Sequence, residues 1–240
     1  MTAVLLLTAT VDPGTCVMTA RTDPQARLHD YRASLTHWFA HPPCNDIVFC
    51  ENSAWPVADF QTQAEAARSA GIRFEHLSFR DDTGDPLRGK GFGEIGIIAH
   101  ALAQSQILRD ATHVVKATGR YVVHNAGDLF ALAARTPPPD VACDLRNHLT
   151  VGDARFFLAS TTFLRQHLLP LRAAIDDRAG VFFEHALARA VHAGLADGMT
   201  WAMPPRPPEL SGVGGSFGQK LWTSPGKWLR WRMKRKLFGY

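Results

Sequence analysis

Hydrophobic and polar positions alternate in blocks along the first 123 residues. Residues 3–10 form a short aliphatic run that ends in Thr and is followed by Asp-Pro-Gly, which is typical of a buried strand leading into a turn. Residues 24–39 place Leu28, Tyr31 and Leu35 at helical spacing, so they predict an amphipathic helix. Further blocks predict a strand at 46–53, a helix at 62–71 that ends at a glycine, and a strand at 72–79. This βαβαβ order predicts a parallel, doubly wound sheet.

The same alternation continues through the second half of the chain. The segment RGKGFGE at 88–94 opens a helix, and residues 112–123 are rich in β-branched side chains and predict one further strand. A strand-like FFLAST, a helix around 161–175 and a helix at 181–195 follow the Pro-rich residues 136–140. Pro-rich and Gly-rich loops end this region. We therefore predict an α/β fold with a mostly parallel sheet flanked by helices, as one domain over 1–218.

Charge separates residues 1–218 from the last 22 residues. Residues 219–240 hold seven of the 26 Lys and Arg residues and no acid, whereas residues 1–218 hold 19 basic and 22 acidic side chains, a net charge of −3. The four cysteines form no CxxC pair, which favours free thiols in a reducing compartment. No segment approaches the roughly 18 apolar residues of a spanning helix, and the first residues lack a basic region. These features predict a cytoplasmic protein.

Polar residues follow the predicted strands at the edge of the sheet where ligands bind in such folds. In an open parallel sheet this edge lies at the carboxyl ends of the strands, and helix capping is the alternative role for these side chains. The candidates for lining this ligand-binding crevice are Thr8, Thr10, Glu51, Asn52, Ser53, Gly119 and Arg120.

Two cationic segments extend this prediction toward phosphate. Lys90 lies in a glycine-bearing loop that opens a helix, where backbone N–H groups can meet anionic oxygens, although the loop matches neither a P-loop nor a dinucleotide fingerprint. Lys116 and Arg120 are four residues apart at a strand end, and both cations suit a leaving diphosphate. A solvated loop and a salt-bridged strand edge are the respective alternatives.

Three residues are candidates for proton transfer. Glu184 and His185 lie in the first turn of the helix at 181–195, and Asp144 lies upstream. A carboxylate in a first helical turn also interacts favourably with the helix dipole. An inverting glycosyl transfer needs one such group to deprotonate the acceptor hydroxyl.

The order of these segments resembles the GT-A-fold glycosyltransferases, especially small transferases of bacterial lipopolysaccharide, O-antigen and capsule clusters. The resemblance rests on IVFCENS, GKGFGE, VVKATGRY, FFEH and GVGGSFG, which cover most of residues 1–220 in order. It implies a GT-A-like, Rossmann-like fold, nucleotide binding after the first two strands, Lys90 over the nucleotide, and Glu184 with His185 beside it as the catalytic base. It also implies a nucleotide-sugar donor and a glycan or lipid-linked glycan acceptor.

One departure from that family concerns metal. Typical members carry an Asp-x-Asp motif at the end of the central strand to bind a divalent ion, whereas this chain has Thr118-Gly119-Arg120 there. We therefore assign no metal ligand and expect Lys116 and Arg120 to neutralise the phosphate. A monophosphate donor such as a CMP-sugar is compatible with this arrangement, so the donor stays open.

The basic tail at 219–240 interleaves aromatic and basic side chains, a composition that suits an anionic membrane surface. The residues assigned to this contact are Lys227, Trp228, Arg230, Trp231, Arg232, Lys234, Arg235 and Lys236. The tail predicts peripheral attachment to the inner face of the cytoplasmic membrane.

Two other functions compete with the transferase. A catalytically silent nucleotide- or sugar-binding protein of the same fold is compatible with the missing Asp-x-Asp. A nucleic-acid-binding protein that uses the tail ranks last, because such proteins usually carry a basic face on the fold and residues 1–218 are net acidic.

Overall fold

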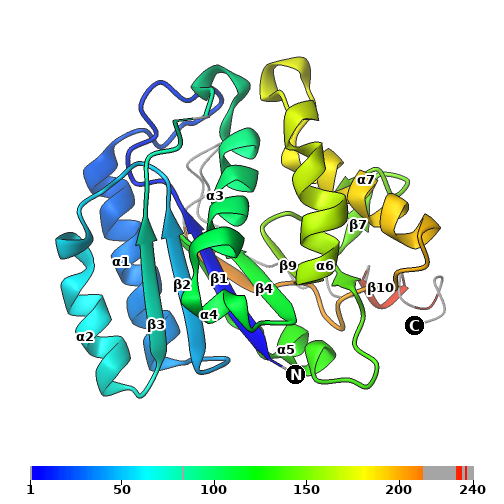
Figure 1. Ribbon diagram of the computed structural model, residues 1–240, viewed down its shortest axis with the longest axis horizontal. Coiled ribbons are helices and arrows are strands. Elements are labelled where there is room, and N and C mark those ends of the chain that lie inside the picture. Colours follow the sequence, from blue (N-terminus) through cyan, green and yellow to red (C-terminus); the bar gives the residue numbers. More distant parts are fainter. Residues whose placement is uncertain (1, 83, 213–230, 234–235, 237–240) are drawn as a thin grey trace.

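The computed structural model describes residues 2–82, 84–212, 231–233 and 236. A seven-stranded sheet forms the centre of the fold, with strand order β10-β6-β9-β4-β1-β2-β3 (Figure 1). Its strands are β1 (Ala3–Ala9), β2 (Asp46–Glu51), β3 (Arg73–Ser78), β4 (His113–Thr118), β6 (Val141–Ala142), β9 (Phe156–Ser160) and β10 (Trp201–Ala202). The four strands β3, β2, β1 and β4 are parallel, and β9 runs antiparallel between β4 and β6. The prediction of a mostly parallel α/β sheet is confirmed.

Helices cover both faces of this sheet because its central strands are apolar on both sides. The helices are α1 (Pro24–Ala40), α2 (Gln61–Ser69), α3 (Lys90–Gln104), α4 (Gln106–Arg109), α5 (Gly127–Ala133), α6 (Thr161–Phe163) and α7 (Phe183–Ala196). In β1, Val4 and Leu6 pack with α3, α4 and α7, whereas Leu5 and Leu7 pack with α1 and α5 on the other face. This alternation is the period-2 pattern expected of a strand buried on both sides.

The segment 112–123, predicted as one strand, is two strands separated by a turn at Gly119-Arg120. After β4 the chain leaves the main sheet, and β5 (Tyr121–Val123) pairs antiparallel with β11 (Leu210–Gly212). Gly119 allows this departure because its N–H donates to the Thr8 carbonyl at 2.8 Å, and a Cβ at Gly119 would lie 2.9 Å from that same oxygen. A third pair, β7 (Leu145–Arg146) with β8 (Val151–Gly152), packs against α7.

The helix predicted around 161–175 is shorter and less regular than expected. Only α6 is α-helical. A π turn follows at Leu164–Leu168 and a 3₁₀ turn at Leu169–Ala174. Pro170, which has no N–H to donate, lies at the start of that 3₁₀ turn, and this explains why the α-helical hydrogen bonds do not continue. In the described part of the chain, no helix is long and apolar enough to cross a bilayer.

Candidate functional site

A cavity of about 370 Å³ opens at the carboxyl ends of β1, β2 and β4. The chain runs outward from β1 to β3 and then returns to β4 on the other side of β1, so the strand order reverses between β1 and β4. Ligands of open α/β sheets bind at such a reversal. Among the residues predicted to bind the nucleotide, those that line this cavity are Thr8, Thr10, Asn52, Ser53, Lys90 and Arg120.

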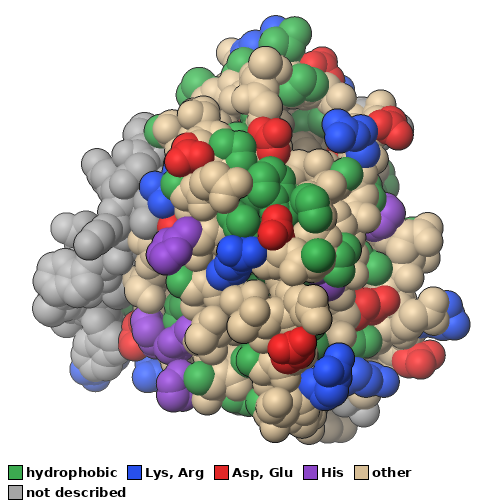
Figure 2. Space-filling model, turned by 90° about the vertical axis from the view of Figure 1, so that its left-hand side faces the viewer, with side chains coloured by type: hydrophobic (Ala, Val, Ile, Leu, Met, Phe, Trp, Pro, Cys, Tyr) green, Lys and Arg blue, Asp and Glu red, His purple; other side chains and the backbone are tan. Residues whose placement is uncertain are grey.

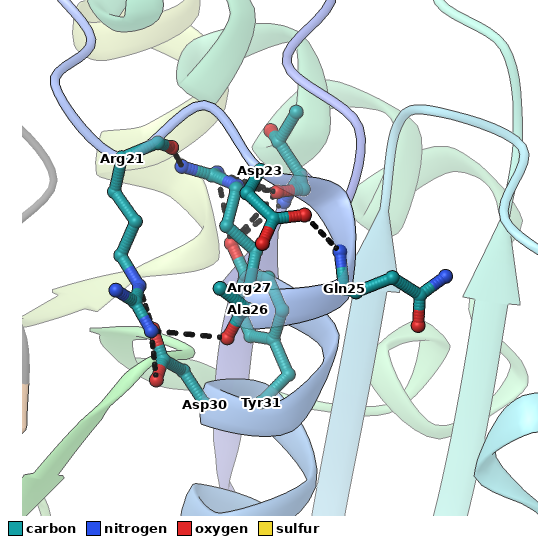
Figure 3. A network of polar contacts seen from close by, with 8 residues as sticks. Arg21, Asp23, Gln25, Ala26, Arg27, Asp30 and Tyr31 are labelled. Carbon is teal, nitrogen blue, oxygen red and sulfur yellow. Dashed lines mark hydrogen bonds and ion pairs between the residues drawn. The ribbon is translucent and has the colours of Figure 1, made fainter.

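The rim of the cavity after β1 is held in place by buried side chains of α1. Arg27 donates through Nε to the Thr10 carbonyl at 2.7 Å, and the Thr10 N–H donates to the Tyr31 hydroxyl at 2.9 Å (Figure 3). The Thr10 hydroxyl in turn lies 2.6 Å from Asn52 Oδ1, which joins the β1 and β2 ends. The polar groups after these two strands are thus ordered in the absence of a ligand, as a preorganised binding site requires.

Glu51 was predicted to bind the ligand, but the structure places it behind the cavity wall. The side chain is fully buried, and one carboxylate oxygen accepts from the N–H groups of Val11 at 3.0 Å and Ser53 at 2.8 Å. The other oxygen accepts from the Trp55 N–H at 3.0 Å. Glu51 therefore organises the two loops that form the rim rather than facing into the cavity.

Lys116 was expected to face a phosphate but lies beneath the cavity floor. Its side chain is 1% exposed, and Nζ lies 2.5 Å from Glu94 Oε1 and 2.7 Å from the Ala154 carbonyl. The ammonium is therefore already neutralised by Glu94, which does line the cavity. This corrects the expectation from the sequence: a lysine in the middle of an apolar strand requires a nearby counter-charge, and here the protein supplies it.

Arg120 differs from Lys116 because its charge has no carboxylate partner in the described part of the chain. The residue is 8% exposed and lines the cavity, yet its Nε and Nη1 atoms find no hydrogen-bond acceptor among the described residues. The guanidinium lies about 6 Å from the centres of the Tyr31 and Tyr121 rings, over which it makes cation–π contacts. A buried cation without acceptors is unfavourable, so Arg120 is the group in this cavity that most needs an anionic ligand.

The start of α3 is less open to anions than the glycine-bearing loop suggested. Gly89 adopts φ +90°, and a Cβ at this position would fall within 2.5 Å of the Asp177 carboxyl group. Asp177 is buried against this turn, and its Oδ2 lies 3.5 Å from the Gly91 N–H. Burial raises the pKa of Asp177, against the opposing effect of nearby Lys90. The glycines therefore allow a carboxyl group of the protein itself to approach the helix N-terminus.

Glu184 and His185 lie at the start of α7, as predicted, but in different environments. His185 Nδ1 accepts from the Phe182 N–H at 3.1 Å, so the imidazole caps the helix. The Glu184 carboxylate is half-buried, and burial raises its pKa; the nearby Glu94 adds to this shift and Lys90 opposes it. Neither Glu184 nor His185 is among the residues that line the cavity. The catalytic roles of both residues stay predictions.

Asp144 lies in a separate cluster of charges. Its carboxylate accepts from Arg146 Nε at 2.5 Å, and Arg146 also pairs with Asp153 at 2.6 Å. Asp153 is bound by Arg155 as well, at 2.6 Å. The structure does not bring Asp144 to the cavity at the ends of β1, β2 and β4.

Three of the predicted membrane-contact residues fall in the described part of the chain: Trp231, Arg232 and Lys236. Trp231 is 7% exposed, and its indole N–H donates to the Pro204 carbonyl at 3.2 Å, so this side chain packs on the domain. The other five, Lys227, Trp228, Arg230, Lys234 and Arg235, lie outside the described residues. The boundary at 218 and the membrane contact of the segment stay predictions.

The prediction about metal also remains open to experiment. Thr118, Gly119 and Arg120 lie at and just after the end of β4, where the sequence resemblance leads one to expect an Asp-x-Asp motif. Within the described ranges, no group of three or more His, Cys, Asp or Glu side chains is placed to hold an ion.

Sequence reasoning missed Glu94 and Arg80 as cavity residues. Glu94 interrupts an apolar helix and faces the strand that carries Lys116, so the pairing of one acid and one base in two apolar segments was the available signal. Arg80 follows β3, lines the cavity and is exposed at its rim. The rule about strand ends applied to β3 would have included it.

Comparisons with known proteins give similarity at the level of solved structures alone. No protein-family model matches the chain, and no curated protein sequence matches it. The chain is similar to a cytidylyltransferase from Leptospira borgpetersenii serovar Hardjo-bovis, with 10% identity and a TM-score of 0.45 over 93% of this chain and 82% of that one. It is also similar to a nucleoside-diphosphate-sugar pyrophosphorylase from Vibrio cholerae RC9, with 11% identity and a TM-score of 0.43 over 84% of this chain and 91% of that one. TM-scores below 0.5 carry no argument about activity.

Proposed function

We propose that this chain is a nucleotide-sugar-dependent glycosyltransferase, with the nucleotide-sugar donor bound in the cavity at the ends of β1, β2 and β4. The observation that carries the proposal is Arg120, a guanidinium that is buried at the reversal of the strand order and has no carboxylate partner among the described residues. Guanidinium groups bind phosphate oxygens through two parallel hydrogen bonds. A phosphorylated ligand in the cavity would supply the missing acceptors.

The remaining lining suits the uncharged parts of a nucleotide-sugar. Hydroxyl and amide groups of Thr8, Thr10, Asn52 and Ser53 line the strand ends, and they can exchange hydrogen bonds with ribose and sugar hydroxyls. Arg80 at the rim provides a second cation for a diphosphate. Lys90 lines the same cavity, and the presence of cations together with neutral donors and acceptors supports a ligand that combines phosphate with polyol.

Glu184 is the proposed general base for the acceptor hydroxyl. A carboxylate with a pKa raised by burial is a stronger base than an exposed one, and its pKa moves toward the pH at which the protein works. Its electrostatic interactions with Glu94 and Lys90, both of which line the cavity, indicate that Glu184 lies near this site. His185, as the cap of α7, would position this carboxylate rather than transfer the proton.

The proposed acceptor is a glycan or lipid-linked glycan at the inner face of the cytoplasmic membrane. Seven basic and no acidic residues in 219–240 support an electrostatic attraction to anionic lipids, worth about 1 kcal/mol for each base near the surface. A nucleic-acid partner is not favoured. The face of the molecule that α1 and α2 cover carries acidic and basic side chains interspersed (Figure 2), without the single-sign surface that such a partner needs.

A thermal-shift panel tests the donor assignment. UDP, GDP, CMP, dTDP and their sugars are each added with magnesium, with manganese or with EDTA, because a ligand that binds only the folded state raises the unfolding temperature. We expect a shift with one nucleotide class that persists in EDTA. If no nucleotide produces a shift at millimolar concentration, the transferase assignment fails.

Turnover separates an enzyme from a silent binding protein. With the nucleotide identified by the panel, Glu184→Gln should lose glycosyl transfer and keep binding of the donor. Release of pyrophosphate from CTP and a sugar phosphate is measured in parallel, because that result would assign nucleotidyl transfer in place of glycosyl transfer. A wild-type protein that binds the donor and turns over neither reaction would be the silent binder.

Flotation with vesicles tests the membrane proposal. The whole chain should float with vesicles that contain anionic lipid and should float less with purely zwitterionic ones. Replacement of the described exposed base Lys236 by Glu should weaken flotation modestly, whereas removal of 219–240 should abolish it. Equal soluble fractions for the whole and shortened chains would exclude this segment as the attachment.

A further inference from the structure

Glu94 has one carboxylate oxygen whose hydrogen-bonding capacity is used within the protein. Its Oε1 accepts from the Thr8 hydroxyl at 2.8 Å, from Lys116 Nζ at 2.5 Å and from the Thr118 hydroxyl at 3.2 Å. These donors come from the ends of β1 and β4, so they fix the carboxylate at the point where the strand order reverses. The orientation of the carboxyl group is therefore set before any ligand binds.

The second oxygen, Oε2, has no hydrogen-bond partner in the described part of the chain. The Glu94 side chain is 21% exposed and lines the cavity. Burial alone would raise the pKa of Glu94, but the Lys116 ammonium and the hydrogen bonds from Lys116, Thr8 and Thr118 outweigh it and lower that pKa. An ionised carboxylate can only accept hydrogen bonds, so a donor group of a ligand in the cavity can bind to Oε2.

Of the other carboxylates of the cavity, Asp81 is bound by an arginine, whereas Asp12 and Asp85 are exposed to solvent and have one oxygen bound by a backbone N–H. Asp81 pairs with Arg172 at 2.6 Å, Asp12 Oδ1 accepts from the Gly14 N–H at 2.9 Å, and Asp85 Oδ1 accepts from the Leu87 N–H at 2.9 Å. Glu94 is the carboxylate on the floor of the cavity, and Arg120 lies two residues beyond its partner Thr118. A carboxylate that can accept a hydrogen bond and a guanidinium that has no carboxylate partner among the described residues thus line the same cavity.

This juxtaposition restricts the ligand. A phosphate oxygen would be repelled by Glu94 and attracted by Arg120, so the two residues must contact different parts of one molecule. A guanine base is one possible donor to a carboxylate, but it uses two N–H groups and so needs both carboxylate oxygens. Oε1 of Glu94 already accepts hydrogen bonds from the protein, which disfavours guanine here. A hydroxyl needs only one oxygen and is the donor that stands beside phosphate in ribose and in sugar phosphates.

Resting on the proposed function, we propose that Glu94 and Arg120 together recognise a hydroxyl that lies close to a phosphate ester: the hydroxyl donates to Glu94 Oε2 and the phosphate accepts from Arg120. Lys116 is a positioning residue that keeps Glu94 ionised and oriented. The ribose of the nucleotide and the transferred sugar both contain this chemistry, and the two sources are distinguished by experiment.

Titration calorimetry of the wild-type protein provides the test without any substitution. The nucleoside diphosphate that binds best is compared with its 2′-deoxy and 3′-deoxy forms, and the nucleotide-sugar is compared with its analogue that lacks the sugar 2-hydroxyl. Loss of a hydrogen bond to a charged group should weaken binding about 10- to 100-fold for one of these analogues. The analogue that loses affinity identifies the source of the hydroxyl.

Two variants assign that loss to Glu94. Glu94→Gln combined with Lys116→Met removes the buried charge pair as a whole, so neither partner is left unpaired. This double variant should bind hydroxyl-bearing and deoxy ligands with affinities within about threefold of each other. Asp12→Asn is the matched control, because Asp12 lines the same cavity but is exposed to solvent, where water can bind its carboxylate, and it should keep the wild-type discrimination.

The possible results separate this inference from the proposed function. Equal wild-type affinity for every analogue overturns the role of Glu94 and leaves nucleotide binding intact. Hydroxyl-dependent binding of simple sugar phosphates without binding of any nucleotide supports the role of Glu94 and overturns the proposed donor. Absence of binding by all of these ligands overturns both.

Discussion

Two clusters of acidic and basic side chains in this molecule differ in how completely their charges are paired. Around Asp153, Arg146 and Arg155 each lie 2.6 Å from the carboxylate, and Arg146 also holds Asp144. At the cavity, Glu94 pairs with Lys116, but Arg120 has no acceptor for Nε and Nη1 among the described residues. The first cluster has its charges paired within the protein, whereas the second leaves two guanidinium nitrogens of Arg120 without an acceptor among the described residues.

This difference shows how to separate charged residues that are paired within the fold from charged residues that are candidates for binding a ligand. A perturbed pKa does not distinguish the two clusters, because the pKa values of Asp153 and Glu94 are both lowered by cations that overcome the effect of burial. The two clusters do differ in whether each buried donor has a hydrogen-bond acceptor. A buried donor without an acceptor is rare in folded proteins and calls for an explanation. At Arg120 the explanation that we propose is a phosphorylated ligand.

The largest expected effect is on stability at the complete cluster. Asp153→Asn leaves Arg146 and Arg155 without their shared counter-charge and should lower the free energy of unfolding by about 2–3 kcal/mol at pH 7, a value reduced because both guanidinium groups are partly exposed. Urea denaturation measures the change.

The pH dependence of this effect is a second readout. Because the folded protein lowers the pKa of Asp153 below its ordinary 3.8, the stability that it contributes is present above that value and is lost as the pH falls through the lower, folded-state pKa. The gap between wild type and variant should therefore close in acid. A gap that is independent of pH would show that packing rather than charge is responsible.

The next effect is on ligand affinity at the incomplete cluster. Arg120→Met keeps an unbranched apolar stem and removes the guanidinium, so affinity for a phosphorylated ligand should fall about 100-fold. The unfolding temperature of the ligand-free protein should stay the same or rise, because no protein carboxylate loses a partner among the described residues. Calorimetry and thermal denaturation measure the two quantities.

Arg80→Met is the matched control for this prediction. Arg80 lines the same cavity but is exposed at the rim, where solvent screens its charge, so affinity should fall only about two- to fivefold. Equal losses for the buried and the exposed arginine would contradict the view that burial makes Arg120 the main anion contact.

The smallest effect concerns Glu184, which has the opposite pKa shift from Glu94 and Asp153. Its folded-state pKa is raised above the ordinary 4.5, mainly by burial, so the folded protein loses stability relative to the unfolded chain as the pH rises from 4.5 through that higher value. Glu184→Gln should therefore be more stable than wild type at pH 7, and the two proteins should differ least below pH 4.

The pH dependence of the glycosyl-transfer rate tests the catalytic role of Glu184, which stability measurements do not test. If the carboxylate is the base, the rate of glycosyl transfer in the wild type should rise with pH as Glu184 ionises, and this rise should be absent from the residual activity of Glu184→Gln. A pH–rate profile that is the same in both proteins would remove Glu184 from the mechanism and leave donor binding untouched.

The local pattern of hydrophobic and polar residues was sufficient to predict the strands and helices whose boundaries do not depend on contacts with distant residues. The aliphatic run of β1 and the helical spacing of α1 determined both elements within a residue or two. The pattern failed at 112–123, where β-branched residues on both sides of Gly119 looked continuous. Only the close approach of Gly119 to the Thr8 carbonyl breaks that run into β4 and β5, and that contact joins residues 111 positions apart.

For the site, the rule that ligands bind at the carboxyl ends of parallel strands placed Thr8, Asn52 and Arg120 at the cavity from sequence alone. The rule could not tell which polar groups were already occupied. Glu51 is the last residue of β2 and Asn52 is the next residue, yet the Glu51 carboxylate accepts hydrogen bonds from backbone N–H groups of two loops. Lys116 and Arg120 are equally cationic in the sequence, but only Lys116 faces an acid of α3.

The sequence by itself thus determined the order of the elements, the mostly parallel sheet and the edge at which polar groups gather, because these depend on local periodicity and on the direction of the strands. The tertiary structure decided which charges are paired within the protein and which remain for a ligand. That choice depends on helices that cross the sheet from distant parts of the chain, such as α3 with Glu94, and on distances of about 3 Å that no spacing in the sequence encodes.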